Sequence, residues 1–440
     1  MLNFLPIMNE ALNFKVEGGK KLKGSVEIKK SKNAAVAILC ASLLNEGQTT
    51  LKKIPRIEEV FRIIEVLQSI GVNVYWQGED LLIKPEKINL SKINLPAAKK
   101  TRTVIMMIGP LIHLFKKFSI PHSGGCKLGE RIVSPHFYAL ENFGVSIKTT
   151  ADEYLIESKD LKPAEFVLYE MGETATENAL MGAAGITGIS KIKFASSNYM
   201  VQDLCHFLVA LGIKIEGIGT STLIVHGKKK INVDVTFEIS EDPIEAMFFL
   251  ASAIVTKSQI TIKKCPIDFL ELELLKLKKM GFKYEIKRTY KGENGFVNLV
   301  DIKTFASNLT ALKEKIHPLT YPGINMDNIP FFAVIATQAE GETFIHDWPY
   351  EKRAIYYTEL EKLGASVVLA DQHRVYIKGK TALHSTEIIS PEALRPAAII
   401  LIGMLAAKGT SILRNVYSIK RGYEDIANRL NKLGAKIEVF

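Results

Sequence analysis

The chain has 440 residues, more than the roughly 100–200 residues that form one domain, so we expect two large domains. Apolar residues make up 47% and charged residues 24%, a balance typical of a globular protein with a sizeable core. The net charge of +10 comes from basic residues scattered among acidic ones, which argues against a nucleic-acid partner. No apolar stretch approaches the ~20 residues of a membrane helix, so we expect no membrane span.

The four cysteines, Cys40, Cys126, Cys205 and Cys265, lie far apart in the chain. None belongs to a C-x-x-C pair or lies near a His cluster at zinc spacing, so we predict no structural metal. Unpaired cysteines are typical of a reducing compartment, and the expected location is the cytoplasm.

One pattern recurs along the whole chain: leucine, two residues, an apolar residue, glycine, and then alternating apolar residues. The copies span 67–74, 140–147, 208–215, 277–284, 360–367 and 430–437. Their glycines are Gly71, Gly144, Gly212, Gly281, Gly364 and Gly434. Helical apolar spacing, a glycine just past the helix end and period-two alternation predict a helix, a glycine stop and a strand in each copy.

Further strands are predicted around these copies. Residues 75–83 indicate a hairpin, and strand patterns precede most copies, at 48–51, 189–192, 259–262, 342–345 and 410–413. A unit of about seventy residues is longer than most solenoid repeats, which favours compact units in two groups of three. The groups would meet near 239–243, where Asp242-Pro243 predicts a chain reversal. Chance recurrence of a common helix-to-strand junction is the alternative.

The first candidate site is Ser31-Lys32-Asn33-Ala34-Ala35, which opens a predicted apolar helix. A lysine and an amide at a helix start could bind an anionic oxygen together with the unpaired backbone N–H groups. A surface lysine is the ordinary alternative.

The second candidate is the segment 123–131, Ser-Gly-Gly-Cys-Lys-Leu-Gly-Glu-Arg. Its three glycines predict a flexible loop that could close over a substrate. Lys127 and Arg131 would lower the pKa of the Cys126 thiol and favour its reactivity. A glycine-rich surface turn with an incidental cysteine is the alternative.

The remaining candidates lie in the second half. Asp327 stands before a predicted apolar helix ending at 339–341, where a helix N-cap is its simplest role. Arg395 and Arg421 introduce predicted helical segments, and the guanidinium fork suits phosphate or carboxylate. If the fold brings Lys32, Arg131, Arg395 and Arg421 together, they form a cationic pocket for a small phosphorylated acid, with a carboxylate and a thiol for proton transfer.

These motifs, in this order, resemble the enolpyruvyl transferases, and most closely the branch that uses UDP-N-acetylglucosamine as acceptor. The likeness runs from about Phe14 to the end and is strongest in KNAA (32–35), GGCKLGER (124–131), ATEN (175–178) and RGYE (421–424). The resemblance implies a two-domain inverse α/β barrel of six βαβαββ units, three per domain. It implies a first domain of 32–240, a second domain of 9–31 plus 241–440, and an active site in the cleft between them.

The resemblance also implies the chemistry. Such enzymes transfer the enolpyruvyl group of phosphoenolpyruvate to the 3-hydroxyl of the nucleotide sugar and release phosphate, the first committed step of peptidoglycan precursor synthesis. Neither a metal nor an organic cofactor is expected, the partners are small molecules, and the expected state is a monomer. The phosphoenolpyruvate-binding residues implied are Lys32, Arg131, Arg395 and Arg421.

Three catalytic residues follow from the same resemblance. Cys126 is implied as the proton donor and as the thiol that fosfomycin alkylates, Asp327 as the general base, and Lys32 as the third. The acceptor-binding residues implied are Asn33, Arg102, Arg131, Ser134, Thr174, Asp327 and Pro349.

The departures from the family pattern lie mainly on the acceptor side. Ile132-Val133-Ser134 replaces a Pro-Val-Asp turn, and Glu170 and Gly172 replace a lysine and a serine. Asn198-Tyr199-Met200 replaces a Glu-Pro-Glu stretch, and Ala393-Leu394-Arg395 replaces Asp-Leu-Arg. Two alternatives therefore stay open: a transferase for another acceptor, such as a different nucleotide or shikimate 3-phosphate, and a non-catalytic metabolite-binding protein.

Overall fold

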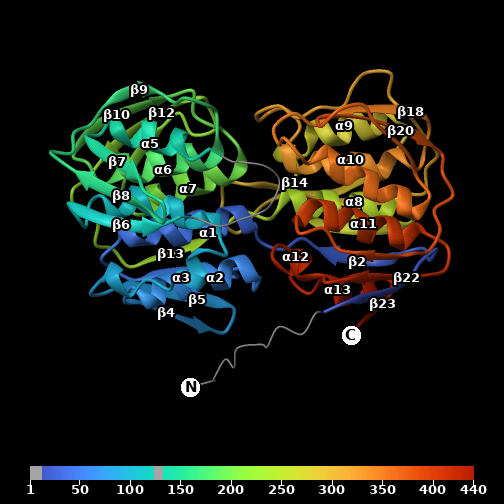
Figure 1. Ribbon diagram of the computed structural model, residues 1–440, viewed down its shortest axis with the longest axis horizontal. Coiled ribbons are helices and arrows are strands. Elements are labelled where there is room, and N and C mark those ends of the chain that lie inside the picture. Colours follow the sequence, from blue (N-terminus) through green and yellow to red (C-terminus); the bar gives the residue numbers. More distant parts are fainter. Residues whose placement is uncertain (1–11, 123–131) are drawn as a thin grey trace.

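The protein consists of two α/β halves that lie side by side (Figure 1). The structure is a computed structural model and describes residues 12–122 and 132–440. Buried apolar side chains form two separate cores: one contains residues between 34 and 239, and the other contains residues 14–28 together with residues between 244 and 437. The N-terminal strands therefore pack with the second half of the chain.

The strands of the first half form three sheets. Their orders are β13 (Val235–Glu238), β3 (Thr49–Lys52), β5 (Asp80–Pro85), β4 (Val72–Gln77); then β6 (Lys117–Pro121), β8 (Glu153–Ser158), β7 (Val145–Thr149); and β11 (Lys214–Glu216), β12 (Thr222–Gly227), β10 (Gly188–Lys193), β9 (Glu165–Val167). In the two four-stranded sheets one parallel pair is followed by an antiparallel hairpin.

The second half repeats this pattern with three four-stranded sheets. Their orders are β15 (Lys283–Lys291), β16 (Asn298–Phe305), β14 (Gln259–Pro266), β2 (Lys23–Glu27); then β17 (Leu309–Thr310), β18 (Ala339–His346), β20 (Arg374–Gly379), β19 (Ser366–Leu369); and β21 (Glu387–Ile389), β22 (Thr410–Arg414), β1 (Phe14–Glu17), β23 (Lys436–Val439). Strand β1 lies between β22 and β23, so the two ends of the chain complete one sheet.

In each half the central, buried helices lie inside and the sheets lie outside. In the second half α8 (Pro243–Val255), α10 (Ile329–Ala336) and α11 (Leu394–Ala406) contact one another, and each also packs on a strand. Almost every residue of these helices is buried, as expected for a helix that is apolar on all sides. In the first half α1 (Lys32–Ala41), η3 (Arg102–Met107) with α4 (Ile108–Leu111), and α6 (Glu173–Ala184) occupy the corresponding positions.

The other helices complete the repeated units. They are α2 (Glu58–Ser69), α3 (Leu95–Ala98), α5 (Ser134–Glu141), α7 (Tyr199–Ala210), α9 (Glu271–Lys279), α12 (Tyr417–Lys420) and α13 (Ile426–Lys432), with a long 3-10 helix η6 (Ala354–Leu363) and short ones at η1 (Ser42–Leu44), η2 (Leu90–Lys92), η4 (Ile267–Phe269) and η5 (Met326–Asn328). The predicted α/β class with repeated units is confirmed. The sheets remain separate, so the described residues contain helices surrounded by sheets rather than a closed strand barrel.

The six glycines of the repeated pattern all have positive φ angles, between 85° and 98°. A side chain is strained in this left-handed region, which explains why glycine ends each of these helices before the following strand turns back. The predicted strand segments upstream and the hairpin after Gly71 are also present. One difference is that Gly364 follows the 3-10 helix η6 rather than an α-helix.

Three local predictions were wrong. The helix after Asp327 ends at Ala336, not at 339–341, because Ala339 and Glu340 pair with β17 and the residues from Gly341 onward pair with β20. Asp242 caps α8 and accepts from the backbone N–H groups of its first turn, so Asp242-Pro243 starts a helix instead of reversing the chain. Arg421 follows α12 rather than introducing a helix.

Two extended segments connect the halves. Lys30 pairs with Glu241 in an isolated bridge, and the backbone N–H of Ser31 donates to the carbonyl of Ser240 at 2.9 Å. Within residues 12–122 and 132–440, no helix is both long enough and apolar enough to cross a bilayer.

Candidate active site

Asp327 lies in the short helix η5 before α10, and its charge interacts with that of Lys32 in the first half. Its carboxylate accepts from Arg395 Nη2 at 3.1 Å and Nε at 3.3 Å, and Arg353 Nη1 lies 3.6 Å away. Burial alone would raise the pKa of Asp327, but Arg395, Arg353 and Lys32 outweigh it and the net shift is downward. The carboxylate is therefore ionised and able to accept a proton. The cap of η5 is Asn325, so Asp327 does not serve that role.

The two arginines beside Asp327 also form hydrogen bonds with other buried side chains. Arg395, near the start of α11, is 5% exposed and donates from Nη1 to the Tyr423 hydroxyl at 2.8 Å. Arg353 is fully buried, and its Nε and Nη2 donate to the two carboxylate oxygens of Asp347 at 2.6 and 2.5 Å. A bidentate pair of this kind fixes the guanidinium plane, so the charge around Asp327 is set before a substrate arrives.

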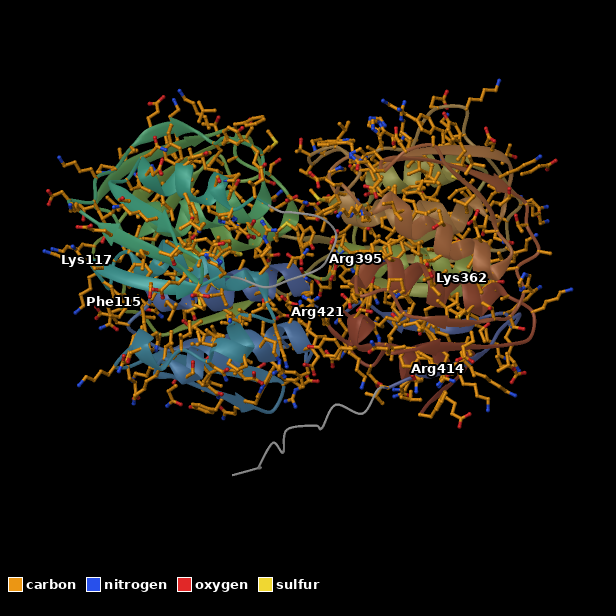
Figure 2. All side chains as sticks on the ribbon, viewed as in Figure 1. Phe115, Lys117, Lys362, Arg395, Arg414 and Arg421 are labelled. Atoms are coloured by element: carbon orange, nitrogen blue, oxygen red, sulfur yellow. The ribbon has the colours of Figure 1, made fainter. Side chains whose placement is uncertain are left out.

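Arg421 of the second half forms an ion pair with Glu59 of the first half. Its Nη2 and Nε donate to Glu59 Oε2 at 2.6 and 3.1 Å, and Glu59 Oε1 accepts from the Thr101 hydroxyl at 2.6 Å. Burial raises the pKa of Glu59, but Lys32 and Arg421 outweigh burial and the net shift is downward. Arg421 and Arg395 both lie at the junction of the halves (Figure 2).

Lys32 is the first residue of α1, whose N-cap Ser31 accepts from the backbone N–H of Ala34. Burial lowers the pKa of Lys32, and its charge interacts with Glu59, Arg395, Asp327 and Arg421. Lys32 therefore lies among the charged residues of both halves. The next residue, Asn33, donates from Nδ2 to the hydroxyl of Tyr199 at 3.1 Å.

Three of the implied acceptor-binding residues lie around His136 in the first half. Arg102 donates from Nη2 to the carbonyl of Ile132 at 3.1 Å, and Ser134 begins α5 two residues later. Thr174, in the first turn of α6, has its hydroxyl 3.3 Å from His136 Nε2. Burial, with the charge of Arg102, lowers the pKa of His136 to about 3, so this ring is neutral.

Pro349 lies in the second half, in the loop between Asp347 and Arg353. Cys126 and Arg131 belong to residues 123–131, which lie outside the described residues. Within the part of the chain that the structure describes, no three His, Cys, Asp or Glu side chains gather in a way that could hold a metal ion.

Several residues of this site escaped the sequence analysis. Glu59 and Arg353 stand in segments without any motif, so nothing local distinguishes them from surface charges. Tyr423 belongs to the RGYE segment, and Tyr199 belongs to one of the departures noted above, but neither position alone indicates a contact. His136 follows Ser134-Pro135 at a helix start, which gives no sign of its buried place between Arg102 and Thr174.

Comparisons with known proteins point in one direction. The model of the family described as EPSP synthase (3-phosphoshikimate 1-carboxyvinyltransferase) matches residues 16–430. The chain is 33% identical to a protein of Bradyrhizobium diazoefficiens named UDP-N-acetylglucosamine 1-carboxyvinyltransferase, over 97% of this chain and 98% of that protein. A protein of the same name from Treponema denticola is 34% identical over 96% and 98%.

Solved structures agree in fold. The enolpyruvyl transferase NikO from Streptomyces tendae superposes with a TM-score of 0.83 at 22% identity, covering 98% of this chain and 99% of that one. EPSP synthase from Acinetobacter baumannii gives 0.73 at 17% identity, covering 98% and 100%. At these identities the solved structures show a shared fold only. The family model and the full-length relatives show that the chain is homologous to these proteins. The chain therefore belongs to the family of enolpyruvyl (1-carboxyvinyl) transferases.

Proposed function

We propose that the protein transfers the enolpyruvyl group of phosphoenolpyruvate to the 3-hydroxyl of UDP-N-acetylglucosamine and releases phosphate. The observation that carries the proposal is an ionised carboxylate, Asp327, held against Arg395 and Arg353 beside Lys32. This arrangement combines a proton acceptor with positive charge suited to a small phosphorylated acid. Relatives that span nearly the whole chain carry the name of this reaction.

Each residue receives a role in this proposal. Lys32, Arg131, Arg395 and Arg421 bind the phosphate and carboxylate of phosphoenolpyruvate. Cys126 adds a proton to the methylene carbon of phosphoenolpyruvate, and Asp327 removes the proton of the acceptor hydroxyl as its oxygen bonds to C2. The tetrahedral intermediate then loses phosphate and a proton of the new methyl group, which restores the carbon–carbon double bond.

The acceptor lies between the two halves. Asn33, Arg102, Arg131, Ser134, Thr174 and Pro349 are proposed to contact it, in addition to Asp327. The proposed domains are 32–240 and 9–31 plus 241–440, with the reaction between them; the two separate buried cores support this division. The product enters peptidoglycan precursor synthesis in the cytoplasm, and the enzyme acts as a monomer.

Phosphate release from the purified protein with phosphoenolpyruvate tests this function. Parallel reactions contain UDP-N-acetylglucosamine, shikimate 3-phosphate, or no acceptor. Release that requires the nucleotide sugar supports the proposal. Release with shikimate 3-phosphate alone, or none with either acceptor despite measurable phosphoenolpyruvate binding, contradicts the proposed acceptor.

Fosfomycin tests the role of Cys126 separately. The wild-type protein should lose activity on incubation with the drug, because the drug alkylates a reactive thiol. Cys126→Asp should keep turnover, since a carboxylic acid can also donate a proton, and should resist the drug. Wild-type activity that is insensitive to fosfomycin would remove Cys126 from the proposed site.

A further inference from the structure

Tyr199 links the start of α1 to the opposite half of the protein. It is the first residue of α7 and only 1% of its surface is exposed. Its hydroxyl accepts from Asn33 Nδ2 at 3.1 Å. Because Asn33 follows Lys32 directly, this hydrogen bond restrains the side chain at the start of α1, where the cationic residues meet.

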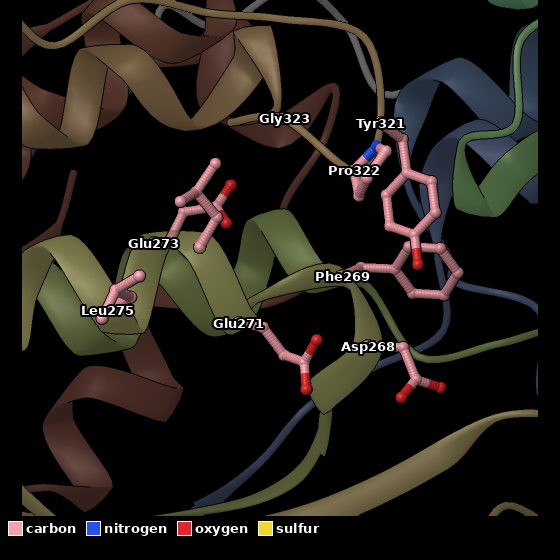
Figure 3. A pocket seen from close by; sticks show the side chains of 9 residues that line it. Asp268, Phe269, Glu271, Glu273, Leu275, Tyr321, Pro322 and Gly323 are labelled. Carbon is pink, nitrogen blue, oxygen red and sulfur yellow. The ribbon is translucent and has the colours of Figure 1, made fainter.

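The ring of Tyr199 contacts the second half. It packs edge-on against Phe269, with ring centroids 5.7 Å apart, and Phe269 lies 5.0 Å from the ring of Tyr321. Figure 3 shows Phe269 and Tyr321 together at the edge of the second half, next to elements of the first. The hydroxyl of Ser197 also donates to the carbonyl of Tyr321 at 3.2 Å. Ser197, just before α7, and Tyr199, the first residue of α7, thus both contact the second half.

The surroundings of the hydroxyl keep it neutral. Burial raises the pKa of Tyr199 well above its ordinary value, and the negative charges of Asp242 and Asp327 add to this effect. A hydroxyl that stays protonated can accept from Asn33 and still donate one hydrogen bond of its own. Asn33 therefore keeps its partner across the working pH range.

We propose that Tyr199 is a positioning residue, which makes the orientation of Asn33 depend on contact between the two halves. The ring senses the second half through Phe269, and the hydroxyl transmits that contact to Asn33 at the acceptor side of the site. The inference rests on the proposed function, in which Asn33 contacts the acceptor. It also gives a role to a tyrosine that stands at one of the departures from the family pattern.

Tyr199→Phe tests the hydroxyl while keeping the ring. The KM for UDP-N-acetylglucosamine should rise about 3- to 10-fold, as expected for one lost hydrogen bond, while the KM for phosphoenolpyruvate and the melting temperature stay near wild type. Phe269→Leu keeps the hydrogen bond and removes the ring contact, and should raise the same KM about 2- to 5-fold. Tyr290→Phe is the matched control. The hydroxyl of Tyr290 donates to Asp301 at 2.8 Å, and this hydrogen bond does not involve Asn33.

Hydrogen–deuterium exchange separates this inference from the proposed function. Both variants should speed exchange in a peptide covering 28–39 whichever acceptor the enzyme uses, and Tyr290→Phe should not. Faster exchange in a protein that ignores the nucleotide sugar would leave the positioning role in place and overturn the acceptor. Three outcomes would overturn the inference. The first is unchanged exchange in Tyr199→Phe, and the second is an unchanged acceptor KM in an enzyme that uses the nucleotide sugar. The third is an effect of Tyr199→Phe without an effect of Phe269→Leu.

Discussion

The two sides of the candidate site are built differently. On the second-half side, Asp327, Arg395 and Arg353 contact one another, and both arginines are bound from behind by Tyr423 and Asp347. On the first-half side, the implied acceptor-binding residues contact different partners: Arg102 donates to the carbonyl of Ile132, the Thr174 hydroxyl lies 3.3 Å from His136, and Asn33 donates to Tyr199. The side that carries the proposed general base, Asp327, is thus pre-assembled, because charge that must stabilise a transition state works best when it need not reorganise.

The departures from the family pattern follow the same division. Those at 132–134, 170, 172 and 198–200 all belong to the first half, and only Ala393 lies beside the arginines of the second. A side chain that contacts only the acceptor can change with the acceptor, whereas a member of an interlocked ion network cannot change alone without leaving a buried charge unpaired. We therefore expect the acceptor-binding residues of the first half to tolerate exchange better than the ion network around Asp327.

Replacing Asp327 should give the largest effect. Asp327→Asn removes the proton acceptor, and we expect kcat to fall by about 10²- to 10⁴-fold. Binding of phosphoenolpyruvate should persist, because Arg395 and Arg353 keep their charges. Steady-state kinetics and calorimetric titration measure the two quantities. Glu157→Gln, in an exposed pair with Lys159, is the control; a variant of Asp327 that keeps kcat within about tenfold would exclude it as the base.

Replacing Arg395 tests whether geometry or charge alone matters on the second-half side. Arg395→Lys keeps the charge but loses the fork that contacts Asp327 and Tyr423, and the KM for phosphoenolpyruvate should rise about 10- to 100-fold. Arg414→Lys, in an exposed pair with Glu387, controls for the exchange itself. Equal KM values for the two variants would mean that the pre-assembled network contributes nothing to binding.

Asp203 tests the connection between the halves. Burial raises its pKa to about 7, although Oδ1 accepts from the backbone N–H and the hydroxyl of Ser240, both at 3.0 Å. An unfolded aspartate titrates near ~3.9, so between that pH and about 7 the folded state binds the extra proton and the free energy of unfolding falls as pH rises. Asp203→Asn cannot ionise and should lose less stability over this range.

Near pH 8 the free energy of unfolding of Asp203→Asn should exceed that of the wild type by about 1–3 kcal/mol, and near pH 4 the two values should be equal. Urea unfolding at both pH values measures it. Asp234→Asn is the matched control, because the carboxylate of Asp234 accepts from the backbone N–H of Gln48 at an exposed position. Parallel pH curves for wild type and Asp203→Asn would show that Asp203 is not protonated in the folded protein.

The smallest effect concerns Lys32. Burial lowers its pKa and the charges of Arg395 and Arg421 lower it further, so its positive charge is lost at a lower pH than the ~10.4 of a free lysine. The value of kcat/KM for phosphoenolpyruvate should therefore decline on the alkaline side below that pH. Lys32→Arg keeps its charge and should remove this limb from the pH profile. The same alkaline limb in both proteins would assign it to another group.

The fold was predictable where the cause is local. A glycine that must adopt a positive φ, an apolar stripe at helical spacing and period-two alternation each depend on neighbouring residues, and all six glycine stops are present. The end of the helix after Asp327 was predicted wrongly because β18 begins at Ala339, where it pairs with Leu309 of β17, a contact that the sequence around Ala339 does not indicate. The insertion of β1 into the sheet of the C-terminal strands is likewise invisible from the sequence around Phe14.

The repeated units, the position of Lys32 at a helix start and the charge types available to the site all follow from local sequence. Which of these charges meet depends on the tertiary structure. Arg421 and Glu59 are separated by 362 residues, and no pattern near either predicts their ion pair. Asp327 meets Arg353 and Arg395, and Tyr199 meets Asn33, for the same reason. Helix and strand signals arise from neighbouring residues, whereas the pairing of buried charges depends on how whole elements pack, which local sequence does not encode.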